Sequence, residues 1–278
     1  MAKVRNFLLE SSEKPIFIGE DSILSRSAPP FSCPVVRDFP RLPGCGNPFE
    51  REDIMISQCA LSGGTSTIRL VLMSDTHGHH RDVTVPNGDM LLHAGDFTYF
   101  NGSTFAIRDF NNWLGQLPHR SKVLIPGNHD SGFVDPAFRE LITNAKLLIN
   151  EGIVIDGLRI WGSPVTPNDW GAFGPETAQE RGCLFSRIPL DTDVLITHGP
   201  PKGILDDASR PNKSQGCDQL LAAVRRVRPQ LHVFGHIHQR YGILRSVETM
   251  FVNAALAGPD YTPTKTPVVL DVQLRCTT

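Results

Sequence analysis

Residues 68–77 read IRLVLMSDTH, an apolar run followed directly by an aspartate and a histidine. The same arrangement recurs along the chain, because further apolar runs precede HAGDF (93–97), PGNHD (126–130), THGPP (197–201) and GHIH (235–238). The acidic, amide and imidazole side chains of these five motifs are Asp75, His77, Asp96, Asn128, His129, Asp130, His198, His236 and His238. Each motif follows a predicted strand, so polar side chains gather where strands end.

Short apolar runs from residue 68 onward predict β-strands, and segments of helical spacing lie between several of them. Helices are predicted at 105–117 and 215–227, where apolar residues recur three and four positions apart. Strands alternating with helices indicate an α/β fold with buried sheets, in which ligands bind beyond the carboxyl ends of the strands. The predicted strands are 68–73, 90–93, 122–125, 152–155, 158–162, 193–197, 230–235, 248–253 and 267–272.

The first 66 residues are interpreted as an irregular N-terminal extension. Six prolines fall between residues 29 and 48, and this stretch has neither helical nor strand periodicity. Residues 67–278 are predicted to form one domain, since a chain of 278 residues that is 40% hydrophobic suits one large domain plus an extension. Whether the extension packs against that domain or covers its functional site is left open.

Composition and charge narrow the classes of partner. A formal net charge of −2 argues against nucleic acid as a partner. The apolar run at 7–9 is shorter than the ~7–15 residues of a signal-peptide core, and no stretch reaches the ~18 apolar residues of a membrane span. We therefore expect no membrane association and a cytoplasmic location. Six scattered cysteines without CxxC spacing argue against a zinc ribbon or a dense disulfide framework.

The donors of the five motifs indicate a metal site. Carboxylate, amide and imidazole groups without thiolate suit hard-to-borderline divalent ions. We expect the motifs to converge at one edge of the sheet because each follows a strand. Four glycines beside the donors are expected to allow the tight turns that aim each side chain away from its strand, namely Gly95, Gly127, Gly199 and Gly235. A single motif has an ordinary structural explanation, but the ordered set of five does not.

This ordered set, D-x-H, G-D, G-N-H-D, a later H and G-H-x-H, resembles the calcineurin-like metallophosphoesterase superfamily. The runs LLHAGDFT, FNNWLGQLP, THGPP and RRVRPQLHVFGHIH resemble more narrowly its metallophosphoesterase-domain-containing, brain-type subfamily. The resemblance extends from residue 68 to near the C-terminus and leaves the N-terminal extension uncovered. It implies a four-layer α/β/β/α sandwich of mixed sheets, with the metal site at the C-terminal edge of the strands.

The resemblance also implies two divalent metal ions, drawn from Mn, Fe, Zn or Mg, with manganese the expected ion. It assigns the first ion to Asp75, His77 and His238, the second to Asn128, His198 and His236, and the bridge between them to Asp96. Some brain-type relatives have glycine in place of His236, a change expected to weaken the second site. The intact set in this chain favours a competent enzyme.

The implied reaction is hydrolysis of a phosphate ester by attack of a metal-bridging hydroxide. The predicted catalytic residues are Asp96, Asn128 and His129, with His129 as the general acid that protonates the leaving alkoxide. In protein phosphatases of the superfamily an aspartate three positions after the bridging one orients the acid histidine. Here that position is Tyr99, so the orienting partner of His129 stays open, with Asp130 a candidate. The run GDFTYFN in place of GDxxDRG also argues against a Ser/Thr protein phosphatase.

The favoured function is a phosphodiesterase for a small phosphorylated substrate such as a cyclic nucleotide. The alternatives are a nuclease of the same superfamily and a low-turnover metal-binding scaffold with an unidentified protein partner. Trp170 and Phe173, in the Gly- and Pro-rich loop 163–192, are candidates either for stacking on a nucleobase or for pinning that loop to the core. The sequence does not decide the physiological substrate, the metal or the oligomeric state.

Overall fold

The computed structural model describes residues 67–100, 102–167, 171–175, 177–207 and 214–274. The predicted N-terminal extension lies outside these residues, so the division of the chain at residue 66 stays a prediction. Two sheets form the centre of the described domain. Among the described residues, no helix combines the length and the apolar character needed to cross a membrane.

The first sheet has the strand order β11-β1-β2-β3-β4. β1 (Thr67–Met73), β2 (Met90–His93), β3 (Ser121–Leu124) and β4 (Lys146–Leu147) are parallel, and β11 (Val268–Gln273) pairs antiparallel with β1. The parallel strands therefore direct their carboxyl ends to one edge, where the chain continues into MSDTH, HAGDF and PGNHD.

The second sheet has the order β5-β6-β7-β8-β10-β9. Its central strands are parallel and its two edge strands, β5 and β9, are antiparallel to their neighbours. The strands are β5 (Glu151–Ile155), β6 (Leu158–Ser163), β7 (Val194–Thr197), β8 (Leu231–Phe234), β9 (Gly242–Arg245) and β10 (Met250–Asn253). The motifs THGPP and GHIH follow the parallel strands β7 and β8.

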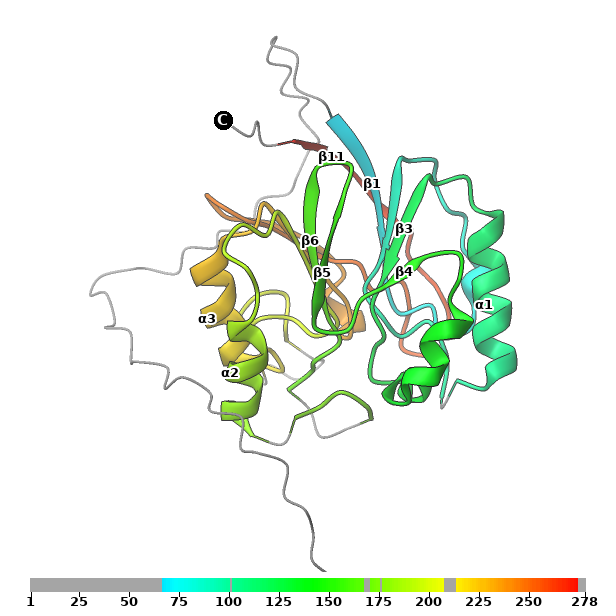
Figure 1. Cartoon of the computed structure of the whole chain (residues 1–278), viewed down its shortest axis with the longest axis horizontal. Coiled ribbons are helices and arrows are strands. Elements are labelled where there is room, and N and C mark those ends of the chain that lie inside the picture. The colour runs from blue at the N-terminus through cyan, green and yellow to red at the C-terminus, as the bar shows by residue number, and fades with distance from the viewer. Residues whose placement is uncertain (1–66, 101, 168–170, 176, 208–213, 275–278) are drawn as a thin grey trace, which may run out of the picture. The chain divides into compact units, whose positions relative to one another are not determined.

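Apolar side chains on both faces of the sheets define the layers. Successive residues of a strand point to opposite faces, so Leu70 and Leu72 of β1 join the core between the two sheets, whereas Val71 and Met73 join the core beneath α1. α1 (Thr104–Gln116) covers the first sheet, and α2 (Ala178–Ser186) and α3 (Asp218–Val227) cover the second (Figure 1). This arrangement confirms the predicted four-layer α/β/β/α sandwich of mixed sheets.

The predicted elements match the observed ones with three differences. All nine predicted strands are present. The short β4 and the edge strand β9 were not predicted, because their apolar patterns are too short to show a period. α3 begins at Asp218 rather than at 215, because Cys217 pairs with Pro201 in an isolated bridge. The prediction of a loop over residues 163–192 was wrong in part, since α2 lies within this range. α2 begins at a capping box formed by Thr177 and Glu180. The short 3₁₀ helices are His80–Asp82, Ser131–Val134, Pro136–Leu141 and His238–Arg240.

Candidate metal centre

The five motifs meet where the carboxyl ends of the two sheets come together. Parallel hydrogen bonding continues past the strands, with Asp75 N donating to Gly95 O (2.9 Å) and Gly235 N donating to His198 O (3.0 Å). A bridge between Ser74 and Ala255 joins the first sheet to the second at the same edge. The predicted convergence is therefore observed, with three motifs contributed by the first sheet and two by the second.

Several donor residues themselves adopt left-handed backbone conformation. The φ angles are 56° at Asp75, 42° at His77, 54° at Asp96 and 68° at His236. Only a few per cent of non-glycine residues adopt positive φ, and each costs on the order of 1 kcal/mol or more. Hydrogen bonds in the surrounding loops, such as His77 N to Asp96 O at 2.9 Å, hold these conformations. The sharp turn after a strand is thus made by the donors, which aims their side chains across the sheet edge.

The glycines beside the donors have different roles from the predicted one. Gly95 does adopt a positive φ of 100°, as expected for a tight turn. The interpretation was wrong for Gly127 and Gly235, because neither has positive φ and both are needed for close packing. A Cβ at Gly127 would overlap the Asp96 carboxylate, and a Cβ at Gly235 would overlap the Asp75 carboxylate. Gly199 has room, since a Cβ there would come no closer than 3.5 Å to a neighbouring atom.

Replacing Gly235 with Ala is expected to weaken divalent-ion affinity about tenfold or more, because overpacking that costs ~1–3 kcal/mol would displace Asp75. The matched control is Gly199→Ala, which adds the same methyl group beside His198 without a clash. Calorimetric titration of the metal-free variants with Mn²⁺ measures both affinities. Equal Mn²⁺ affinities of Gly235→Ala and Gly199→Ala would contradict the conclusion that the position of the Asp75 carboxylate determines ion binding.

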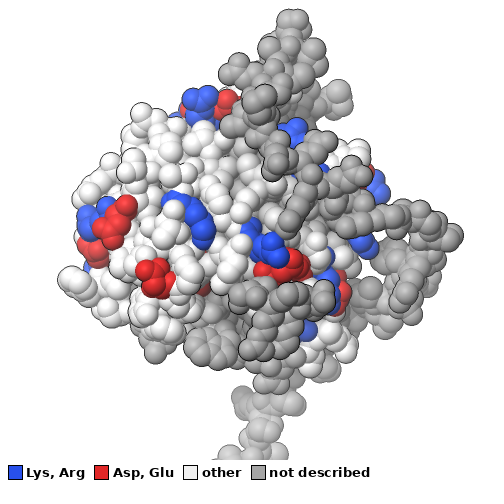
Figure 2. Space-filling view, turned by 180° about the vertical axis from the view of Figure 1, so that it is seen from behind, with Lys and Arg blue, Asp and Glu red and all other residues white. Residues whose placement is uncertain are grey.

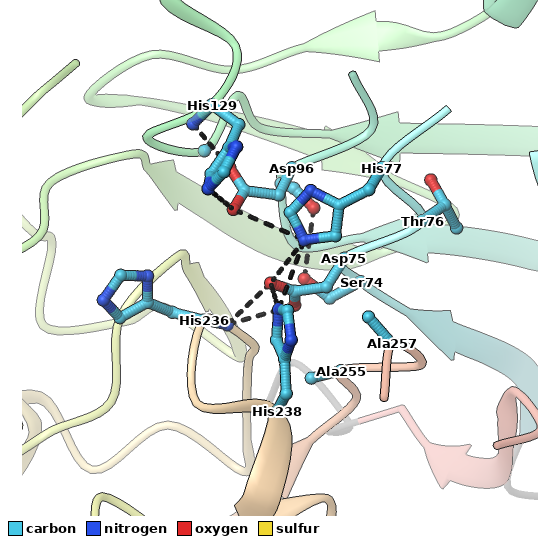
Figure 3. A network of polar contacts seen from close by, with 12 residues as sticks. Ser74, Asp75, Thr76, His77, Asp96, His129, His236, His238, Ala255 and Ala257 are labelled. Atoms are coloured by element: carbon cyan, nitrogen blue, oxygen red, sulfur yellow. Dashed lines mark hydrogen bonds and ion pairs between the residues drawn. The ribbon is translucent and has the colours of Figure 1, made fainter. Parts of the chain in front are cut away.

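The first donor group contains Asp75, His77 and His238, whose ligand atoms lie within 4.8 Å of one another. His238 Nε2 is 3.2 Å from both Asp75 Oδ1 and His77 Nε2. Figure 3 shows the two imidazoles pointing toward each other over the Asp75 carboxylate. Asp96 Oδ2 lies 3.9 Å from His77 Nε2, which places the Asp96 carboxylate beside this group.

The second donor group contains Asp96, His198 and His236. His198 Nε2 is 3.2 Å from Asp96 Oδ2 and 2.9 Å from Asn128 Oδ1. Asn128 Oδ1 is also 3.0 Å from His236 Nδ1, so the amide oxygen lies between two imidazoles. Asp96 therefore belongs to the second group and also lies with His77 and His129 in a further group of three beside the first. Asn128 adds an oxygen donor to the second group.

These donors fit divalent cations on two observations. Ligand atoms ~2.0–2.2 Å from one ion at tetrahedral or octahedral angles lie about 3.0–3.5 Å apart, and several contacts above fall in that range. A metal-binding histidine also donates its second N–H to a carbonyl or carboxylate, which leaves the other nitrogen unprotonated. His198 Nδ1 lies 2.8 Å from Ala94 O and His238 Nδ1 lies 3.2 Å from Gly258 O, so both rings direct Nε2 into the cluster.

The charge balance of the cluster also favours a cation. Burial opposes protonation of His198, but the carboxylates of Asp96 and Asp75 outweigh it and raise the pKa of this imidazole to about 9. Burial lowers the pKa of His77 and of His236 to about 4, so those two rings are neutral donors at physiological pH. Despite burial, the hydrogen bond to Asp75 also raises the pKa of His238. The carboxylates thus attract positive charge, and cation binding at His198 competes with its proton.

His129 lies at the edge of the cluster, and its orienting partner is a backbone carbonyl. His129 Nδ1 is 2.5 Å from Tyr99 O, which makes Nδ1 the donor and directs Nε2 toward Asp96 Oδ2 at 3.9 Å. Asp130 was the wrong candidate, because its buried carboxylate instead accepts hydrogen bonds from Thr98 N (2.8 Å) and Gly127 N (2.8 Å). Tyr99 thus occupies the position predicted for an orienting aspartate, but acts through its main chain.

Aromatic side chains beside the cluster differ from the predicted pair. Phe173 is partly buried and packs against the core beneath α1, which agrees with pinning of the loop rather than with base stacking. Trp170 lies outside the described residues. Among the described residues, the rings beside the donors are Tyr99, Phe100 and Tyr261, with Tyr261 4.8 Å from His77 between ring centroids. The sequence carried no signal for Tyr261, since no motif or period includes it.

Charged side chains of both signs lie on the face of the molecule that Figure 2 shows. On the face in Figure 2, Lys and Arg lie next to Asp and Glu rather than in a broad region of one sign. Several are ion-paired, such as Arg69 with Asp271 (2.9 Å). The described residues of this face form no continuous basic footprint of the kind that nucleic acid requires.

Fold and donor set together are those of the calcineurin-like phosphoesterase family, and the chain belongs to it, since residues 68–240 match that family. The chain is 38% identical over 233 residues to human metallophosphoesterase domain-containing protein 1, covering 73% of this chain and 71% of the human protein. A UPF0046 protein of Caenorhabditis elegans is 37% identical over 208 residues, covering 69% of this chain and 71% of the worm protein. One crystal structure is similar in fold alone, with a TM-score of 0.53 at 13% identity over 76% of this chain and 100% of that chain. The chain is therefore a metal-dependent phosphoesterase, as the sequence motifs predict.

Proposed function

We propose that the protein hydrolyses small phosphodiesters, cyclic nucleotides among them, with two divalent ions held by the two donor groups. The observation that carries this proposal is the position of Asp96, whose Oδ2 is within 3.2 Å of His198 and 3.9 Å of His77. One carboxylate that belongs to two donor groups is suited to bridge two ions. The ligands of the first ion are Asp75, His77 and His238, those of the second are Asn128, His198 and His236, and Asp96 belongs to both.

In a two-ion site of this kind the ions supply an activated water and positive charge opposite the phosphoryl oxygens. The chain's own residues supply position and a proton. Asp96 and Asn128 are held by hydrogen-bonded loops, including His129 N to Asp96 Oδ1 at 2.8 Å. His129, with Nδ1 bound to Tyr99 O, presents Nε2 as the proton donor to the leaving alkoxide. Mn²⁺ is the first ion to test, and a cytoplasmic location remains our expectation from the sequence.

His236→Gly is expected to lower the bound Mn²⁺ from two ions per chain to one, because it removes an imidazole of the second donor group. Turnover of a phosphodiester should fall about a hundredfold or more, since loss of one ion removes several kcal/mol of charge stabilisation. Atomic emission after equilibrium dialysis measures the ion count. The matched control is His79→Gly, which removes an exposed imidazole paired with Asp82.

The test of the function itself is hydrolysis of a generic phosphodiester and a generic phosphomonoester by protein that has been stripped of metal and reloaded. Turnover of the diester that depends on the reloaded ion supports the proposal. A wild-type protein that binds ions but hydrolyses neither ester under any metal would favour the scaffold interpretation. Preferential cleavage of single-stranded nucleic acid over small diesters would favour the nuclease.

A further inference from the structure

Three aromatic side chains, Tyr99, Phe100 and Tyr261, form what we term the aromatic rim of the metal centre. Tyr99 and Phe100 are each 51% exposed. The ring centroid of Tyr99 lies 5.0 Å from that of Phe100 and 5.7 Å from that of Tyr261. Large half-exposed aromatic groups that cluster beside a polar site are a feature of binding surfaces rather than of ordinary surface.

The aromatic rim directly adjoins the donor cluster. Tyr261 lies 4.8 Å from His77 and 5.3 Å from His238, and Phe100 lies 4.6 Å from His129, measured between ring centroids. Centroid separations this short mean that the rings of the rim and of the donor histidines are in direct contact. The organic part of an ester whose phosphoryl group reaches the donors would therefore lie at the aromatic rim. Tyr99 meets both Phe100 and Tyr261 edge to face, at interplanar angles of 89° and 81°, rather than in a parallel stack.

The position of Tyr261 is set by its backbone and by the metal centre. Its φ of 65° is left-handed, which is rare for a bulky residue and is found where surrounding structure enforces it. Tyr261 N donates to Gly258 O (3.2 Å), and the same carbonyl accepts from His238 Nδ1 (3.2 Å). Lys265 Nζ donates to His238 O at 2.7 Å and ties this turn to the GHIH loop. The backbone of Tyr261 is therefore held next to the GHIH loop by contacts within the chain.

We propose that the aromatic rim is a subsite for a flat aromatic ring carried by the organic part of the substrate. This inference rests on the proposed function, because it takes the phosphoryl group to lie at the donors. Stacking of one base on aromatic side chains changes affinity by about tenfold or more. The shared chemistry is a planar ring next to a phosphate, which a nucleobase or an aryl ester provides.

The test uses four phosphonates that cannot be hydrolysed, titrated calorimetrically into the Mn²⁺-loaded full chain. Two are the methylenephosphonate analogues of AMP and of ribose 5-phosphate, which differ only in the base. The other two are benzylphosphonate and methylphosphonate, which differ only in the aryl ring. We expect about tenfold tighter binding of the ring-bearing member of at least one pair. A preference in the first pair alone identifies a nucleobase subsite, and one in the second pair alone identifies an aryl subsite.

Variants then assign the preference to the aromatic rim. Tyr261→Asn removes the ring but keeps a residue that tolerates left-handed backbone, and Tyr99→Leu removes the second ring while keeping the carbonyl that binds His129. Each should lower the ratio of affinities about tenfold, whereas Tyr261→Phe should retain it. The control is Phe105→Leu, which alters an aromatic side chain on α1 that is 80% exposed.

The outcomes separate the subsite from the function. Equal affinities within both pairs of phosphonates would overturn the subsite and leave the proposed function standing, because the phosphonate group itself still binds. A ratio that survives both ring deletions would likewise overturn the assignment to the aromatic rim. Failure of all four phosphonates to bind would overturn the subsite alone, because the proposed function is tested separately by metal-dependent hydrolysis of the diester.

Discussion

Asp96→Asn is expected to reduce phosphodiester turnover about a thousandfold or more and to abolish the thermal stabilisation that Mn²⁺ provides. In the proposed site Asp96 is the ligand shared by the two ions, since its buried carboxylate faces His198 at 3.2 Å and His77 at 3.9 Å. Loss of the anionic bridge removes several kcal/mol of charge stabilisation, and each ~1.4 kcal/mol is a factor of ten in rate. Asparagine has nearly the same shape as aspartate, so the substitution removes the negative charge of the side chain and leaves its size unchanged.

The thermal measurement gives a readout that does not depend on turnover. A ligand at about one hundred times its Kd adds ~2.7 kcal/mol to the free energy of unfolding. For a domain of this size that corresponds to a rise in Tm of about 5–10 °C. Wild-type protein should show this rise on addition of Mn²⁺, and Asp96→Asn should show little of it.

A buried carboxylate elsewhere provides the control for this experiment. Asp193→Asn breaks the ion pair with Arg159, whose Nε lies 2.9 Å from Asp193 Oδ2, and should lower the Tm of the metal-free protein. Its rise in Tm on metal addition should equal that of wild type. If Asp96→Asn retained the full metal-induced rise, Asp96 would not be a shared ligand and the two-ion proposal would lose its main support.

The convergence of the donors could be predicted from sequence because it depends on topology. Asp75, Asp96 and Asn128 each follow a strand of one parallel sheet, and parallel strands end at the same edge whatever their side chains. The same argument covers His198 and His236 in the second sheet. The two periodicities of strand and helix were also sufficient to place α1 and every strand of the two sheets except β4 and β9, since these elements bury apolar faces.

The rest of the site could not be predicted, because it depends on contacts between distant segments and on backbone conformation. Tyr261 reaches His77 through a turn whose sequence has no periodicity, and the left-handed φ of Asp75 and His236 leaves no mark in residue type. α2 was missed for another reason, since its apolar pattern is weak. The capping box of Thr177 and Glu180 was a local signal that could have identified its start.

His129 illustrates the difference between predicting a residue and predicting its environment. Its position after Asn128 indicated a general acid, but the expected carboxylate partner is replaced by the carbonyl of Tyr99. The Tyr99 carbonyl can only accept a hydrogen bond, so Nδ1 of His129 must carry the hydrogen and the tautomer of the ring is fixed. Unlike a carboxylate, the carbonyl adds no negative charge beside His129. One possible ligand atom from each of His129, His77 and Asp96 lies within 4.8 Å of the other two. The geometry alone therefore also permits His129 to be a metal ligand.

His129→Gln separates these two roles through the leaving group. If His129 protonates the leaving alkoxide, its loss should slow hydrolysis of a dialkyl phosphate by ~10²–10⁴-fold. A p-nitrophenyl diester, whose leaving group departs without a proton, should lose less than about tenfold by the same argument. Glutamine matches the reach of the imidazole but cannot act as an acid, so the difference between the two esters isolates the proton.

The ion count decides between the acid and the ligand. His129→Gln should still bind as many Mn²⁺ ions as wild type, because Asp75, His77 and His238 complete the first donor group without it. His119→Gln, which removes a buried imidazole bound to Pro86 O at 3.0 Å, is the control and should not change the ratio of the two ester rates. Equal rate losses for both esters together with a lost ion would make His129 a ligand, and the proton donor would then have to be sought among the other groups that face the leaving oxygen.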